Sequence, residues 1–115
     1  QLLILQRGMT DPWMPNAFSL PGGCAKGEET ALETALRETR EEIGIKPKRL
    51  YFIKTINSKR MGNIHFFTGA IDTDEINLCQ ENQSYQFIDS EQVDDFDFIP
   101  YVKDFIQSIF KKKTR

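Results

Sequence analysis

Short apolar runs, separated by polar segments rich in glycine and proline, predict that strands and helices alternate along this chain. Residues 1–7 begin with "QLLIL" and predict a buried strand, followed by a loop over 8–18 in which two prolines disfavour a helix. Residues 49–58 and 63–71 predict a hairpin closed by "KRMG", and residues 84–89 predict a further strand.

A helix is predicted to follow the glycine-rich loop "SLPGGCAKG". Thr30 and Glu33 have the spacing of a capping box, and Gly44 is placed to end the helix in a left-handed conformation. The apolar stripe of this helix, which we expect to be buried, consists of Leu32, Ala35, Leu36, Thr39 and Ile43. At Thr39 the hydroxyl is expected to bond back to the Ala35 carbonyl.

A second helix is predicted over residues 101–113, after a polar loop at 72–83 and an irregular link at 90–100. Its apolar face contains Tyr101, Val102, Phe105, Ile106, Ile109 and Phe110. Strands and helices with both hairpin and crossover connections indicate an α/β layered domain.

Composition narrows the possible functions. The 115 residues are 39% hydrophobic and 28% charged, which fits a single domain. A net charge of −2 disfavours binding to long nucleic acid, and no apolar run reaches the length of a membrane span. Cys24 and Cys79 have neither metal-ligand nor disulfide spacing, so reduced thiols in a cytoplasmic protein are expected. His65 is interpreted as a strand residue.

Three glutamates gather on one side of the first helix. At about 100° per residue, Glu38, Glu41 and Glu42 fall within roughly 100° of arc. Like charges at this spacing repel, whereas three carboxylates near one point suit a hard divalent cation such as Mg²⁺. Arg37 precedes Glu41 by four residues and can pair with it. The structural alternative is a solvated acidic face.

The spacing of these residues resembles the signature of the Nudix hydrolases. The matching positions are Gly23, Glu29, Arg37, Glu38, Glu41, Glu42, Gly44 and Ile45. One position departs from the family pattern, because Thr39 stands where a bulky aliphatic residue is expected.

This resemblance implies a fold and a domain organisation. We expect one Nudix domain over residues 1–115, built as an α/β/α sandwich with a mixed β-sheet between helices. The first strand of the family is expected to lie upstream of residue 1. Because that strand helps to line the family's substrate pocket, pocket assignments depend on it.

The resemblance also implies a reaction. Nudix enzymes cleave a nucleoside diphosphate linked to another moiety, by attack of water on phosphorus with Mg²⁺ or Mn²⁺. The resemblance implies that Glu38, Glu41, Glu42 and the Gly22 carbonyl bind the metal. Gly23, Glu29 and Arg37 are assigned to hold the loop and the helix in register.

The resemblance also suggests roles for residues outside the helix, and each of these has an alternative interpretation. A glutamate in a later loop serves the family as metal ligand or base, and Glu81 is the first choice over Glu75; Glu38 is the alternative base. Arg7 resembles a position that contacts substrate phosphates, or is a surface arginine. Trp13 is a candidate for stacking on a base, or for covering the edge of the core.

The expected substrate is a nucleoside triphosphate, oxidised forms included, as in the MutT-like branch, cleaved to monophosphate and pyrophosphate. An ADP-sugar or dinucleoside polyphosphate hydrolase is the enzymatic alternative, and a non-catalytic nucleotide-sensing module is the other. The expected partner is therefore a small nucleotide, with no long nucleic acid and no membrane, for a monomer or homodimer.

Overall fold

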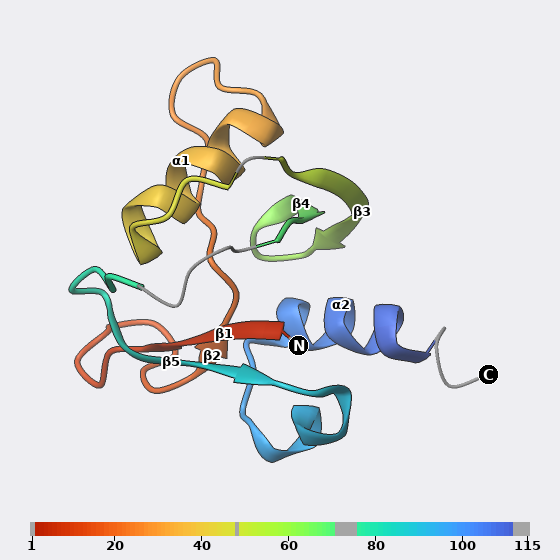
Figure 1. Ribbon diagram of the computed structural model, residues 1–115. Helices are drawn as coiled ribbons and strands as arrows, with labels where there is room; N and C mark the ends of the chain where they lie inside the picture. The colour runs from red at the N-terminus through yellow and green to blue at the C-terminus, as the bar shows by residue number, and fades with distance from the viewer. Residues whose placement is uncertain (1, 48, 71–75, 112–115) are drawn as a thin grey trace. The chain divides into compact units, whose positions relative to one another are not determined.

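The computed structural model describes residues 2–47, 49–70 and 76–111 and divides them into two compact units (Figure 1). One unit joins residues 1–20 to residues 80–115, and the other contains residues 21–79. We call them the terminal unit and the central unit, and each is described by itself.

The terminal unit contains a three-stranded antiparallel sheet in the order β2-β1-β5. Its strands are β1 (Leu2–Arg7), β2 (Phe18–Ser19) and β5 (Asn82–Ile88). Apolar alternation is weak in β1, where three consecutive residues are buried, as expected of a strand covered on both faces. The predicted strands at 1–7 and 84–89 are therefore confirmed, and β5 begins two residues earlier than expected.

Two helical segments complete the terminal unit: a 3₁₀ helix (Ser90–Asp95) and α2 (Pro100–Lys111). The short strand β2, which the sequence pattern did not predict, is held by long-range bonds. The Phe18 amide donates to the Asp97 carbonyl at 2.8 Å, and the Ile99 amide donates to the Phe18 carbonyl at 3.0 Å. The buried side chains of this unit include Ile4, Leu5, Ile88, Ile99, Val102, Phe105 and Ile106.

The central unit contains α1 (Ala31–Ile43) and a hairpin of β3 (Tyr51–Ser58) and β4 (Gly62–Thr68). The predicted capping box is present: the Glu33 amide donates to Thr30 Oγ1 at 3.1 Å, and the Thr30 amide donates to Glu33 Oε1 at 2.8 Å. Gly44 ends the helix with a φ of 75°, in the left-handed region predicted for it.

The predicted apolar stripe of α1 is partly wrong. Ile43 is fully buried, and the Thr39 hydroxyl donates to the Ala35 carbonyl at 2.7 Å, as expected. Leu32, however, is 42% exposed, while Thr34 is buried and donates its hydroxyl to the Thr30 carbonyl. Helical spacing fixes the direction of a side chain around the axis, but it does not determine whether another element covers the first turn.

No helix in the described part of the chain is both long and apolar enough to cross a membrane. Among the described residues, Cys24 and Cys79 form no disulfide. His65 lies in β4, where its Nδ1 is 2.7 Å from Thr55 Oγ1.

Candidate functional site

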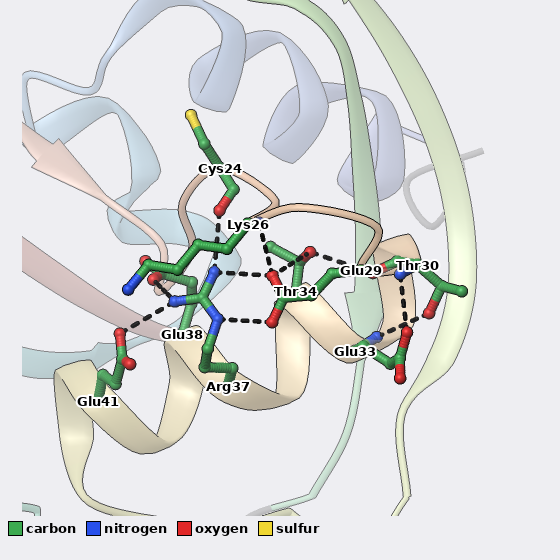
Figure 2. Close-up of polar contacts among 9 residues, drawn as sticks. All are labelled: Cys24, Lys26, Glu29, Thr30, Glu33, Thr34, Arg37, Glu38 and Glu41. Atoms are coloured by element: carbon green, nitrogen blue, oxygen red, sulfur yellow. Dashed lines mark hydrogen bonds and ion pairs between the residues drawn. The ribbon is translucent and has the colours of Figure 1, made fainter.

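The carboxylate side of α1 and the loop before it form a polar cluster centred on Arg37 (Figure 2). We call Glu29, Glu38, Glu41 and Glu42, together with Arg37, the carboxylate cluster. Glu29 comes from the loop, one residue before the helix cap, and the others project from successive turns of α1. All of these residues belong to the central unit.

Arg37 uses all three guanidinium nitrogens in this cluster. Towards Glu29 the contact is bidentate, with Nε to Oε2 at 2.7 Å and Nη2 to Oε1 at 3.0 Å. Nη1 donates to Glu38 Oε1 at 2.6 Å and to Glu41 Oε1 at 3.1 Å, and Nη2 also donates to the Cys24 carbonyl at 2.9 Å. The Arg37 side chain is only 16% exposed. Its planar fork therefore joins the loop to the helix in a way that a lysine cannot reproduce.

The electrostatics of the cluster follow from these contacts. The hydrogen bonds from Arg37, and then the bond from the Lys26 amide, lower the pKa of Glu29 from 4.5 to about 2. The same bonds to Glu29 raise the pKa of Arg37 above its usual value. The predicted pairing of Arg37 with Glu41 is confirmed, at 3.1 Å.

The glycine-rich loop approaches α1 closely at two successive residues. The Gly22 amide donates to Glu42 Oε2 at 2.6 Å. A Cβ atom built on Gly23 would collide with the carboxylate of Glu38, so this position requires a glycine while Glu38 keeps its place. With the Cys24 carbonyl bound to Arg37, residues 22, 23 and 24 each contact the cluster.

The C-terminal end of α1 is also tied down. The Gly44 amide donates to the Arg40 carbonyl at 2.9 Å, and two amides of a later segment donate to carbonyls of the last two helical residues. Asn77 donates to the Ile43 carbonyl at 2.9 Å, and Cys79 donates to the Glu42 carbonyl at 3.0 Å. The turn of α1 that carries Glu41 and Glu42 is thereby held at its end.

The donor chemistry of the cluster fits a divalent cation. Carboxylate and carbonyl oxygens are the ligands that Mg²⁺ and Mn²⁺ prefer. In the described residues, however, no three acidic, histidine or cysteine side chains converge on a point that would hold a metal. Glu38 and Glu41 are turned to Arg37, and Glu42 is turned to the Gly22 amide.

The other predicted site residues lie in the terminal unit. Arg7, at the end of β1, forms an ion pair with Asp11 at 2.7 Å and donates from Nε to the Trp13 carbonyl at 3.1 Å. Its guanidinium carbon lies 5.2 Å from the centroid of the Trp13 ring. Arg7 and Trp13 are thus brought together, which their sequence positions did not indicate.

Glu81 lies exposed at the turn before β5, and its carbonyl accepts a hydrogen bond from the Gly8 amide at 3.1 Å. Glu81 therefore lies near the end of β1, where Arg7 is the strand-pairing partner of Asn82. Its rival, Glu75, lies outside the described residues.

Asp11 was missed by the sequence analysis. Its Oδ1 accepts from the Trp13 amide at 2.9 Å, and its Oδ2 pairs with Arg7. The hydrogen bond from Trp13, and then that from Arg7, lower the pKa of this carboxyl below its usual value. An aspartate that precedes a proline in a loop is a signal for such an Asx turn.

Comparison with known proteins gives a family match over almost the whole chain. The model of the NUDIX domain family matches residues 1–108. A mouse protein, bis(5'-nucleosyl)-tetraphosphatase [asymmetrical], is 35% identical in an alignment of 89 residues that covers 70% of this chain. The match covers 57% of the mouse protein's length.

Solved structures share the fold at low sequence identity. A MutT protein from Methanosarcina mazei Go1 has a TM-score of 0.83 and 21% identity, over 98% of this chain and 85% of that one. An Ap4A hydrolase binary complex from C. elegans has a TM-score of 0.76 and 18% identity, over 97% of this chain and 86% of that one. The NUDIX domain of NrtR from Shewanella oneidensis, complexed with ADP ribose, has a TM-score of 0.76 and 16% identity, over 96% of this chain and 75% of that one. These similarities confirm the predicted fold class.

Proposed function

The chain belongs to the NUDIX domain family, and from that premise we propose that it is a metal-dependent pyrophosphohydrolase. Its substrate would be a nucleoside diphosphate linked to a further moiety, cleaved by water at phosphorus. The observation that carries the proposal is the carboxylate cluster: Arg37 and residues 22–24 hold four acidic side chains on one side of a capped helix. An acidic helix face that was only solvated would not be expected to contact the preceding loop at three successive residues.

Glu38, Glu41 and Glu42, with the Gly22 carbonyl, would hold the divalent cation. When bound, such an ion supplies neutralisation of phosphate charge and lowers the pKa of a coordinated water. The role of Arg37 is to orient, because its bonds to Glu29 and to the Cys24 carbonyl fix the guanidinium independently of Glu38 and Glu41. Those two carboxylates can therefore change partners without loss of the link between loop and helix.

Two glutamates are candidates for the base that receives the proton of the attacking water. Glu81 is our first choice, since it is an exposed carboxylate on a turn anchored to Gly8. Glu38 is the alternative, and its position depends on the close approach of Gly23. Substitution of each by glutamine separates them, because loss of the base lowers turnover more than substrate binding.

For the substrate we propose a nucleoside polyphosphate, with a dinucleoside polyphosphate as the first choice. This choice is supported by the mouse relative, whose name specifies a bis(5'-nucleosyl)-tetraphosphatase. A nucleoside triphosphate, the expectation from the sequence, is the second candidate. Arg7 is proposed to contact the phosphates and Trp13 to stack on a base, since they form one cation–aromatic pair at the end of β1.

The test is a panel of substrates assayed with Mg²⁺: diadenosine tetraphosphate, dGTP, its 8-oxo form and ADP-ribose. We expect diadenosine tetraphosphate to be cleaved fastest, and Glu42→Gln to abolish cleavage of every substrate. Cleavage of dGTP or its 8-oxo form alone would favour the second candidate. Binding of nucleotides with no cleavage of any member would refute the enzyme and support a nucleotide-sensing module.

A further inference from the structure

Asp11 joins two residues of the terminal unit that the proposed function assigns to the nucleotide. One carboxylate oxygen accepts the Trp13 amide at 2.9 Å, and the other pairs with Arg7 Nη2 at 2.7 Å. The side chains of Arg7 and Asp11 are 26% and 19% exposed, so most of the surface of each is covered by protein. Asp11 thus fixes the backbone of the tryptophan and the head of the arginine at once.

The guanidinium of Arg7 is held from three directions. Asp11 binds Nη2, the Trp13 carbonyl binds Nε, and the indole ring lies 5.2 Å from the guanidinium carbon. Across the described ranges, no hydrogen bond or ion pair is formed by Nη1 of Arg7. A planar guanidinium that is oriented in this way offers its remaining N–H groups in one direction, which suits a phosphate oxygen.

The loop between β1 and β2 supports this arrangement beyond the carboxylate. Gln83 of β5 donates from Nε2 to the Arg7 carbonyl and to Asn16 Oδ1, each at 2.8 Å. Met14 and Asn16 have positive φ values of 51° and 64°. Asparagine adopts this left-handed conformation more readily than most residues, whereas methionine seldom does. Backbone strain of this kind persists only where surrounding contacts determine it.

We propose that Asp11 is a positioning residue for nucleotide binding, which presents the Arg7 guanidinium to a phosphate group of the substrate. This inference rests on the proposed function, which places a nucleotide at Arg7. Two effects of Asp11 oppose each other here. Its negative charge repels a phosphate, whereas its hydrogen bond orders the arginine before the phosphate arrives. If Asp11 is a positioning residue, the ordering of Arg7 outweighs the repulsion of the phosphate.

Asp11→Asn tests this directly, because asparagine keeps an oxygen for the Trp13 amide but cannot form the ion pair with Arg7. We would titrate ADP and adenosine by calorimetry in the presence of chelator, so that no turnover occurs. Asp11→Asn should weaken ADP binding about three- to tenfold, while adenosine binding and the melting temperature stay unchanged. Asp104→Asn, an exposed position on α2, is the matched control and should behave as the parent.

A double-mutant cycle shows whether Asp11 acts through Arg7. In an Arg7→Ala background, Asp11→Asn should no longer change the affinity for ADP. The intrinsic fluorescence of Trp13, the sole tryptophan of the chain, reports whether the loop keeps its structure in each variant.

Three outcomes would overturn the inference. One is equal or tighter ADP binding by Asp11→Asn, which would mean that charge repulsion dominates. Another is an equal loss of ADP and adenosine binding with a lower melting temperature, which would make Asp11 structural. The third is a parent protein that binds ADP no more tightly than adenosine. Absence of turnover across the substrate panel would refute the proposed function instead, and the ADP titrations would still decide the role of Asp11.

Discussion

Gly23→Ala should inactivate the protein while leaving it folded. The added methyl group would occupy the position of the Glu38 carboxylate, because a Cβ built on Gly23 meets Oε2, Cδ and Cγ of that side chain. Glu38 must therefore rotate away. Its bond to Arg37 Nη1, at 2.6 Å, would be lost with that rotation.

The expected losses of stability and of activity differ widely. The atoms in collision are the far end of a flexible side chain, and Gly23 is not among the glycines with positive φ. The loss of unfolding free energy should therefore stay below about 1 kcal/mol. A catalytic carboxylate displaced by about 1 Å or more typically costs on the order of 10²-fold in rate, and we expect at least that loss in kcat/KM.

Gly27→Ala provides the matched control in the same loop. Gly27 has a φ of 59°, and a Cβ there would meet nothing within 4 Å. Left-handed backbone strain should destabilise this variant by about 1 kcal/mol, a decrease of about 3–5 °C in melting temperature, with kcat/KM close to that of the parent. The two variants should thus show opposite patterns of stability and activity.

Thermal melts and initial rates with Mg²⁺ on the preferred substrate measure both quantities. Full activity in Gly23→Ala would show that the position of Glu38 is unimportant for turnover. A large loss of stability together with activity would show that the contact between loop and helix supports the fold instead. Either result would contradict the role given to the carboxylate cluster.

Three further predictions concern the cluster and its surroundings. Glu29→Gln should destabilise the protein near neutral pH. Its stability should approach that of the parent as pH falls from 4.5 towards 2, because the native pKa of Glu29 is about 2 against a usual value of 4.5. Thermal melts across that pH range measure the difference in stability, and a constant difference would contradict the prediction. Thr30→Ala should cost about 1 kcal/mol in chemical denaturation, since the Glu33 amide loses its capping oxygen, and an unchanged midpoint would contradict it. Glu81→Gln should lower kcat well before it raises KM, and unchanged steady-state kinetics would remove Glu81 from the reaction.

Sequence predicted those features of the site that are determined locally. The capping box of Thr30 and Glu33, the left-handed Gly44 and the bond from Thr39 to Ala35 all link residues a few positions apart, where helical geometry leaves little choice. The pairing of Arg37 with Glu41, four residues apart, belongs to the same class.

Contacts between distant residues were not predictable in the same way. The bond from Arg37 to the Cys24 carbonyl and that from Cys79 to the Glu42 carbonyl depend on how loops return to the helix. Leu32 was expected to be buried and is exposed, since periodicity does not reveal which turns another element covers. Asp11 was missed because its ion pair depends on the return of the loop towards Arg7.

The central claim is that the carboxylate cluster is a metal site, and melts of the parent and Glu42→Gln with saturating Mg²⁺ and with chelator test it most directly. In chelator the two proteins should agree within about 1 kcal/mol, because glutamine keeps an oxygen for the Gly22 amide and relieves repulsion from Glu38. Mg²⁺ at about a hundred times its Kd should stabilise the parent by about 2.7 kcal/mol, and Glu42→Gln should lose most of that gain. A variant that is much less stable than the parent in chelator, or that gains as much from Mg²⁺, would show that the carboxylates serve the fold and not a metal.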